Sequence, residues 1–260
     1  MNNCKICNGI TRNVFTAQIL KKYDVAYYQC TDCDFVQTEK PFWLEEAYQN
    51  PMNFSDTGIM HRNNKFSKIV TSLIFLYFDR SKKFLDYAGG YGVFTRIMRD
   101  IGFDVYWVDP YTKNMLSRGF EVEKQDTFHL ITTFECFEHL EDPMAEISKM
   151  TAYSKNIIFS TELAPKPLPK VQDWWYYGTE HGQHIAFYSP KSLKVIANKF
   201  NLNYYNIGNL HLFTESKINT IGALFLQFKF SQHLLYMMYF IFSFFMISRT
   251  MSDMQTLKTQ

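Results

Sequence analysis

The sequence predicts an α/β protein with a largely parallel sheet and a small cysteine-bearing module before it. Residues 84–110 read as strand, glycine turn, helix and second strand, and further apolar strands alternate with helices up to residue 213. Two Cys-x-x-Cys pairs lie within the first 33 residues. Alternating strands and helices are typical of parallel sheets. A chain of 260 residues has room for one ordinary core and a small appendage.

Composition excludes several classes of protein. Hydrophobic residues make up 47% and aromatic residues 18%, which excludes a disordered chain. The net charge of +2 gives no electrostatic reason to expect a nucleic acid partner. The first residues lack the apolar stretch of a signal peptide, so we expect a cytoplasmic, reducing compartment in which cysteine pairs bind metal.

Residues 1–40 are predicted to form a zinc-ribbon module. Its two pairs are Cys4 with Cys7 and Cys30 with Cys33. Two thiolates from each pair can converge on one Zn²⁺ ion at about 2.3 Å and close a tetrahedral structural site. Short strands are expected at 14–15 and 25–28. Four unrelated reduced cysteines are the alternative.

Residues 41–80 are predicted to form a helical lid. Helices are expected at 41–50 and 62–78, with a polar turn at 51–58 between them. Turns of this kind often let a lid close over a ligand. Tyr48 and Arg62 are candidates to contact a bound carboxylate or ring, with ordinary surface residues as the alternative.

The segment from 83 to 109 predicts a site for an adenosine cofactor. A strand at 83–86 precedes a glycine turn, a helix at 93–101 and a strand at 103–108 that stops at Asp109. Glycines let backbone amides approach a cofactor, and an acid after the second strand can accept both ribose hydroxyls. A dinucleotide fingerprint would carry a third glycine where Thr95 stands, so a pyrophosphate is disfavoured.

Residues 86–92, DYAGGYG, resemble motif I of the class I S-adenosylmethionine (SAM) methyltransferases, acid-x-G-x-G-x-G. The resemblance implies a Rossmann-like sheet of seven strands in a domain spanning 81–215. It also implies SAM contacts from Asp86, Ala88, Gly89, Gly90, Gly92, Asp109 and Pro110. Ala88 stands where the family's first glycine usually sits, which an alanine with negative φ tolerates. A structural glycine turn in a non-binding α/β domain is the alternative.

The sequence ECFEHLEDP at 135–143 is the next group of potentially catalytic or metal-binding residues. One helical turn would place Glu135, Glu138 and His139 on one side, as a metal site or a general base requires. It resembles the loop beside the transferred methyl group in class I methyltransferases, where Phe134 and Glu135 would flank the cofactor. In ubiquinone-pathway and small-RNA 2′-O-methyltransferases a similar E-x-x-E-H binds a divalent ion. Other relatives have no metal there, and both alternatives stay open.

The string WWYYGTEHGQHIAFYS at 174–189 resembles a segment of sugar methyltransferases that carry an N-terminal cysteine module. The resemblance implies that His139 or His184 removes a proton from the acceptor, with Glu138 as a third catalytic candidate. Residues 174–177 would form a wall of the pocket, and His181 is a weaker candidate base. A purely structural His184 is the alternative.

Residues 216–260 are predicted to form a hydrophobic helix and a polar tail. A helix from 189 to 200 and strands at 202–207 and 209–213 come first and complete the expected sheet. The apolar stretch 234–247 would span only about 21 Å as a helix, which is short of the roughly 30 Å hydrocarbon core. We expect a helix that is buried or that makes peripheral contact with a membrane.

These features together predict a SAM-dependent methyltransferase with structural zinc. The expected acceptor is an O or C atom of a small polar molecule, with a sugar or nucleotide-linked sugar favoured. One alternative is a metal-assisted O-methyltransferase acting on a quinone precursor or an RNA 2′-hydroxyl. The other is an inactive zinc-ribbon interaction protein.

Overall fold

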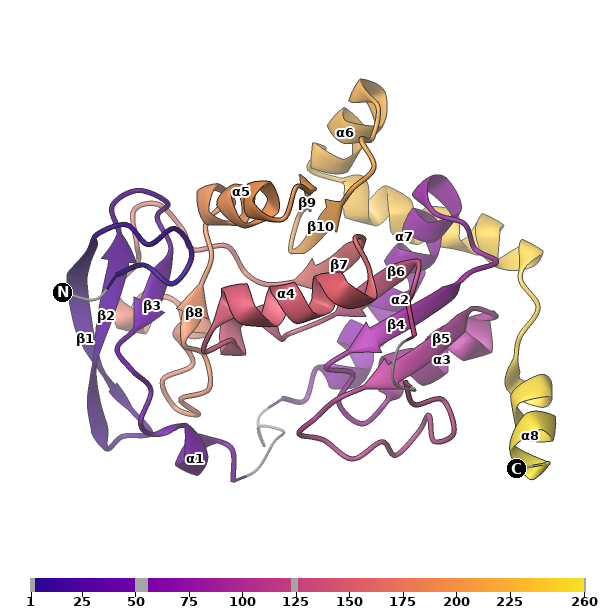
Figure 1. Cartoon of the computed structure of the whole chain (residues 1–260), viewed down its shortest axis with the longest axis horizontal. Coiled ribbons are helices and arrows are strands. Elements are labelled where there is room, and N and C mark those ends of the chain that lie inside the picture. The colour runs from indigo at the N-terminus through magenta and orange to yellow at the C-terminus, as the bar shows by residue number, and fades with distance from the viewer. Residues whose placement is uncertain (1–2, 50–55, 123–125, 260) are drawn as a thin grey trace.

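The computed structural model describes residues 3–49, 56–122 and 126–259, and it contains two sheets that lie side by side (Figure 1). The larger sheet has the strand order β5-β4-β6-β7-β10-β9. Its strands are β4 (Lys83–Tyr87), β5 (Asp104–Val108), β6 (Leu130–Thr133), β7 (Ile157–Ser160), β9 (Asn203–Ile207) and β10 (Leu210–Thr214). The first four neighbours are parallel, and β10 runs antiparallel to both β7 and β9. The predicted α/β class is confirmed.

The predicted number of seven strands in this sheet is wrong for the described residues, which form six. The seventh position, beside β5, is reduced to one parallel bridge between Trp107 and Glu121. The Trp107 amide donates to the Phe120 carbonyl at 2.8 Å, and the Val122 amide donates to the Trp107 carbonyl at 3.1 Å. The turn-rich residues before Phe120 do not extend along β5, so no regular strand forms there.

Helices cover both faces of the larger sheet. One face carries α4 (Pro143–Tyr153) and α5 (Pro190–Lys199), whose buried Ile147 and Leu193 belong to one core cluster. The other face carries α2 (Ile59–Tyr77), α3 (Val93–Ile101), α6 (Thr220–Gln227) and α7 (Ser231–Phe242), which share a second cluster. Asp142 caps α4 by accepting from the Ala145 amide at 3.1 Å, and Pro143 follows at the first helical position.

The smaller sheet holds the cysteines and has the order β1-β2-β3-β8. Its first three strands are β1 (Thr11–Ile19), β2 (Tyr23–Cys30) and β3 (Val36–Thr38), and they are longer than the sequence indicates. Its edge strand β8 (Ala186–Phe187) arrives from beyond β7 and pairs antiparallel with β3. The chain therefore returns to the N-terminal sheet after building most of the larger sheet.

The segment between the two sheets differs from the predicted lid. The expected helix at 41–50 is a single turn, α1 (Leu44–Ala47), whereas the expected helix at 62–78 corresponds to the longer α2. Part of the predicted turn at 51–58 lies outside the described residues. Three further short elements are the 3-10 helices η1 (Phe137–His139), η2 (Val171–Asp173) and η3 (Trp175–Tyr177).

The C-terminal region is helical throughout most of its length. After α6 and α7 come the 3-10 helix η4 (Ser243–Phe245) and α8 (Thr250–Lys258), where a polar tail was expected. Among the described residues, no single helix is long and apolar enough to cross a bilayer. Residues Ser231–Phe245 and Thr250–Lys258 meet that criterion only as a pair bent by 60°.

Candidate active site

The glycine turn lies between β4 and α3, as predicted, and positive φ angles favour glycine at two of its positions, Gly90 and Gly92. Gly92 begins α3 with φ +81, and a Cβ there would lie 2.5 Å from the Ser117 hydroxyl. Gly90 has φ +54, and a Cβ there would meet nothing within 4 Å. The space next to Gly90 is therefore open. A cofactor could approach the backbone amides of the turn through this space, and a side chain at position 90 would block it.

Ala88 corrects one expectation about this turn. An alanine is tolerated here if its φ is negative, but the φ of Ala88 is +55. A residue with a Cβ in this left-handed region costs roughly 1–2 kcal/mol. The conformation explains why related turns place glycine at this position.

Asp109 lies where β5 ends and reaches back to the glycine turn. Its Oδ2 accepts from the Gly90 amide at 2.9 Å, and its Oδ1 accepts from the amides of Tyr111 and Thr112 at 2.8 and 2.9 Å. The carboxylate thus joins the turn to the next loop. A carboxylate offers about four acceptor positions, so Oδ2 keeps one for a further hydroxyl. Pro110 follows and is exposed.

Asp86 lies beneath the turn rather than on its open side. It is 2% exposed, its Oδ2 accepts from the Thr95 hydroxyl at 2.8 Å, and a Cβ on Gly89 would lie 2.8 Å from the same oxygen. Burial raises the pKa of Asp86 to about 7. Asp86 and Thr95 therefore tie the end of β4 to the first turn of α3.

We expect Asp86→Asn to stabilise the protein more at high pH than at low pH. Because the pKa of Asp86 is raised in the folded state, stability is lost as pH rises from 3.8 to about 7. At about 1.4 kcal/mol per pKa unit, the gain in unfolding free energy should be about 2 kcal/mol larger at about pH 8 than at about pH 5.5. Urea unfolding at both pH values measures it, with exposed Asp100→Asn as control. An unchanged pH dependence in the Asp86 variant would contradict the raised pKa.

Phe134 and Glu135 follow β6 and take different directions. The Phe134 ring lies 4.8 Å from the rings of both Phe66 and Phe94, between α2 and α3. Glu135 has φ +49, and its carboxylate accepts from the Ser160 hydroxyl at 2.6 Å. The prediction for E-x-x-E-H assumes that residues 135–139 form one helical turn. The positive φ of Glu135 is not helical, so residue 135 does not belong to such a turn. Glu135 lies outside the group of ligand atoms formed by Glu138, His139 and His184, although its charge contributes to the raised pKa of Glu138.

Glu138 and His139 instead form a cluster with His184. One potential ligand atom from each of the three residues lies within 4.8 Å of the others. Glu138 is fully buried, and its carboxyl oxygens accept no hydrogen bond from the described residues. Burial, reinforced by nearby Glu135, raises the pKa of Glu138 well above its ordinary value. A buried carboxyl group without partners is costly unless a proton, a ligand or a cation satisfies it.

Both histidines in this cluster have a backbone carbonyl as a partner of Nδ1. Nδ1 of His139 lies 3.0 Å from the Gln183 carbonyl, and Nδ1 of His184 lies 2.7 Å from the Tyr176 carbonyl. Because a carbonyl oxygen can only accept, these contacts favour a proton on each Nδ1, with the Tyr48 hydroxyl as a second acceptor at His139, and leave each Nε2 its lone pair. Burial lowers the pKa of His139 to about 4 and that of His184 well below its ordinary value. The cluster therefore presents two neutral imidazole bases at neutral pH.

Tyrosines from two other segments border the cluster. The Tyr48 hydroxyl lies 3.0 Å from Nδ1 of His139, so this candidate does reach the site, whereas Arg62 pairs with Asp56 at 2.7 Å. Of residues 174–177, only Tyr176 packs on His184, with ring centroids 4.7 Å apart. Trp174 and Tyr177 pack in the core of the smaller sheet instead.

The four predicted cysteines form a second cluster. All four Sγ atoms lie within 4.8 Å of one another, with Cys4 to Cys33 at 3.6 Å and Cys7 to Cys30 at 3.4 Å. Ligands 2.3 Å from a tetrahedral Zn²⁺ would be separated by about 3.8 Å. The amides of Ile6 and Asp32 donate to the sulfurs of Cys4 and Cys30 at 3.4 Å, which favours thiolates. The donor set and its geometry fit zinc.

Several residues near the turn could not be singled out from the sequence. The Trp107 indole donates to the Gly90 carbonyl at 3.0 Å, and the Ser117 hydroxyl donates to the Gly92 carbonyl at 2.7 Å. Asn114 in turn accepts from the Ser117 amide at 2.9 Å. The position of Trp107, two residues before Asp109 at the end of β5, could have indicated that it lies near the turn. Asn114 and Ser117 lie in an irregular loop, where no periodic pattern indicates their positions.

Comparison with known proteins identifies the family. The family model described as "Methyltransferase domain" matches residues 60–207, which is more than half of the chain. The chain therefore belongs to the methyltransferase domain family. It is a SAM-dependent methyltransferase, which confirms the class of enzyme predicted from the sequence.

Solved structures of similar fold include two methyltransferases. Magnesium protoporphyrin IX methyltransferase from Synechocystis PCC 6803 with bound SAM is 13% identical, with 68% of this chain and 93% of that chain covered and a TM-score of 0.44. A possible histamine N-methyltransferase from Thermotoga maritima is 12% identical, with 67% and 99% covered and a TM-score of 0.47. A search of curated proteins found no match.

Proposed function

We propose that the chain transfers a methyl group from SAM to an O–H or acidic C–H group of a small polar acceptor. The observation that carries this proposal is the pair of neutral, fixed imidazoles of His139 and His184. His139 follows the carboxyl end of β6, in the chain segment after Phe134, and His184 comes from the segment between η3 and β8. A sugar or a nucleotide-linked sugar is the favoured acceptor because several hydroxyl groups would suit this polar, histidine-rich cluster.

The residues of the turn are proposed to hold SAM. Gly90 offers an open approach to the backbone amides, Asp109 keeps acceptor capacity for a ribose hydroxyl, and Phe134 offers an aromatic face. Asp86, Ala88, Gly89 and Gly92 shape the turn, while Pro110 and Glu135 flank it. The cofactor supplies an electrophilic methyl group, so the protein must mainly align the acceptor and remove one proton.

The lone pairs on Nε2 of the two histidines are proposed to remove that proton. The proton leaves the acceptor oxygen or carbon and binds to Nε2, while the carbonyls of Gln183 and Tyr176 hold the imidazolium through Nδ1–H. Glu138, once ionised, would stabilise the same positive charge. We therefore assign His184 and His139 as catalytic bases and Glu138 as their charged partner.

We expect His184→Asn and His139→Asn to lower kcat while leaving SAM affinity unchanged. Loss of a general base costs typically about 10²–10⁴-fold in rate. Single-turnover methyl transfer to a panel of sugars and nucleotide sugars measures the rate, and calorimetry measures SAM affinity. The matched control is His233→Asn, an exposed histidine on α7. Unchanged rates in both cluster variants would contradict the assignment.

A second candidate, metal-assisted O-methylation, is favoured by one observation. The cluster of Glu138, His139 and His184 has the donor set of a divalent-ion site, with a carbonyl behind each imidazole. Counting metal ions per chain by mass spectrometry distinguishes the two mechanisms. One zinc ion per chain, bound by the cysteines, supports base catalysis without a metal. A second metal ion per chain that is lost in the Glu138→Gln variant supports metal-assisted O-methylation.

A further inference from the structure

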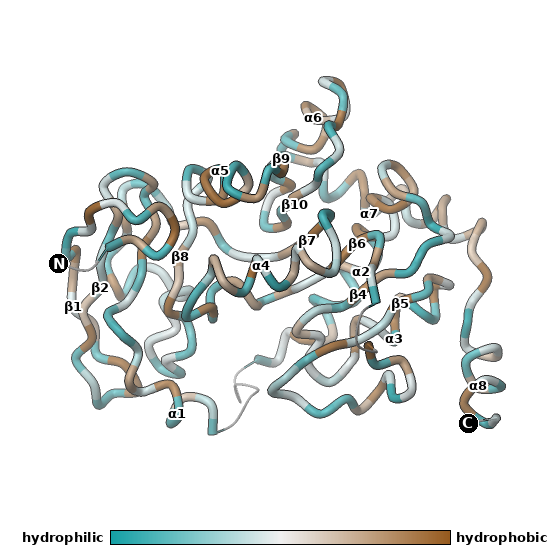
Figure 2. Tube along the Cα trace, viewed as in Figure 1, coloured by the Kyte–Doolittle hydropathy of each residue, from teal (hydrophilic) through white to brown (hydrophobic). Residues whose placement is uncertain are grey.

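The last part of the chain carries an apolar surface that the methyl-transfer site does not use. Of the 24 large hydrophobic side chains exposed on the described residues, 14 lie between residues 221 and 257. We define the apolar face by six of these residues. They are Met237, Phe240, Ile241, Phe244, Phe245 and Ile247. Phe244 is 87% and Ile247 is 88% exposed. Most residues between 237 and 247 are hydrophobic (Figure 2).

The helix α7 is apolar on two opposite sides, and only one of them packs on the protein. Leu235 is fully buried, and Phe242 stacks on Phe75 of α2 with ring centroids 4.6 Å apart. Met237, Ile241 and Phe244 follow one another at helical spacing on the outward side. A helix with apolar residues all round is expected inside a core or against lipid. The outward side of α7 is not covered by the described residues.

The charge around the apolar face selects its partner. Residues 216–252 contain no Asp or Glu, and their charged residues are Lys217, Lys229 and Arg249. Arg249 pairs with Asp104 at 3.5 Å, whereas no ion pair joins Lys217 or Lys229 to a carboxylate among the described residues. A second copy of this surface would bring these lysines together without carboxylates of its own segment to pair them, which disfavours a symmetric dimer. Aromatic and aliphatic side chains in a segment whose own charged residues are all cations suit the surface of a bilayer with anionic headgroups.

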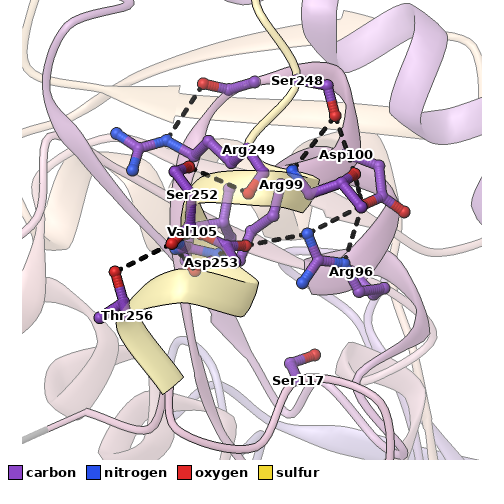
Figure 3. Close-up of polar contacts among 12 residues, drawn as sticks. Arg96, Arg99, Asp100, Val105, Ser117, Ser248, Arg249, Ser252, Asp253 and Thr256 are labelled. Atoms are coloured by element: carbon purple, nitrogen blue, oxygen red, sulfur yellow. Dashed lines mark hydrogen bonds and ion pairs between the residues drawn. The ribbon is translucent and has the colours of Figure 1, made fainter. Parts of the chain in front are cut away.

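The segment that follows the apolar face is tied to the folded domain (Figure 3). Asp253 of α8 is 4% exposed and accepts from Arg99 at 2.7 and 2.8 Å and from Arg96 at 2.9 Å. The Arg249 amide also donates to the Arg99 carbonyl at 3.1 Å. With α7 packed on α2 and α8 held on α3, residues 231–249 are anchored at both ends. Inserting α8 into a membrane would require breaking a buried ion pair.

We propose that the apolar face docks the enzyme onto the surface of an anionic lipid bilayer, without crossing it. The side chains of Phe244, Phe245 and their neighbours enter the boundary between headgroups and acyl chains, while Lys229 contacts the headgroups. The proposal does not depend on the identity of the methyl acceptor.

Flotation of the full-length, zinc-loaded protein with vesicles tests this proposal. We expect binding to vesicles of phosphatidylcholine with about one third phosphatidylglycerol, weaker binding to phosphatidylcholine alone, and weakening as salt is raised. Phe244→Ser with Phe245→Ser should lower binding by about tenfold or more, because both side chains are exposed and lose apolar area. The matched control is Ile10→Ser, which is 61% exposed in the N-terminal module and should bind like the wild type.

Three results would overturn the proposal. The first is absence of binding to the anionic vesicles at low salt, and the second is a double variant that binds as well as the wild type. The third is a dimer in light scattering that the double variant dissociates, because the apolar face would then be an interface between two copies of the chain. Unchanged circular dichroism of the double variant shows that a loss of binding is not a loss of fold.

Discussion

Replacing Cys4 with Ser is expected to unfold the smaller sheet and to abolish methyl transfer. The four sulfurs hold both Cys-x-x-Cys turns, and structural Zn²⁺ contributes an apparent free energy of about 10 kcal/mol or more to small domains. Because β8 pairs with β3 and His184 lies two residues before β8, loss of the sheet also releases His184. SAM affinity should change little, since the glycine turn belongs to the larger sheet.

Zinc content, thermal unfolding and SAM affinity together measure this outcome. Cys136→Ser is the matched control, because Cys136 is a buried cysteine outside the cluster. The control should keep one zinc per chain and its smaller sheet. A Cys4 variant with wild-type zinc content and wild-type unfolding temperature would contradict the proposed zinc site.

Replacing Asp109 with Ala is expected to weaken SAM binding by about 100-fold, which corresponds to the loss of one charge-assisted hydrogen bond of about 1.5–3 kcal/mol. The side chain accepts from Gly90, Tyr111 and Thr112, so its removal frees the turn as well as the proposed ribose contact. Asp109→Asn keeps one acceptor oxygen and should lose less affinity than Asp109→Ala. Equilibrium titration with SAM gives both values.

The control for this series is Asp100→Ala, an exposed acid on α3 that lies outside the turn. It should bind SAM like the wild type. Equal affinities in wild type and Asp109→Ala, with the fold intact, would remove Asp109 from the cofactor site.

Features encoded within a short stretch of chain could be predicted from the sequence. The strand, glycine turn and helix from 83 to 101 follow from local periodicity and from glycines with positive φ. The four cysteines converge because each Cys-x-x-Cys turn positions its own two sulfurs. In both cases the spacing along the chain already determines the geometry.

Features that depend on distant segments could not be predicted. Tyr48 meets His139 across 91 residues, and Asp253 meets Arg99 across 154 residues, so no local pattern signals either pair. The pairing of β8 with β3 likewise brings His184 to the cluster only in the folded chain. The positive φ of Ala88 and Glu135 departs from local propensity, and both residues lie at the site.

Hydrogen exchange of the zinc-loaded protein, with and without the demethylated cofactor, tests the proposed SAM site most directly. We expect slower exchange at the amides of residues 88–92 and 109–112 and in the segment after β6, at cofactor concentrations in the micromolar range. Unchanged exchange in all three segments, or protection confined to other parts of the chain, would contradict it.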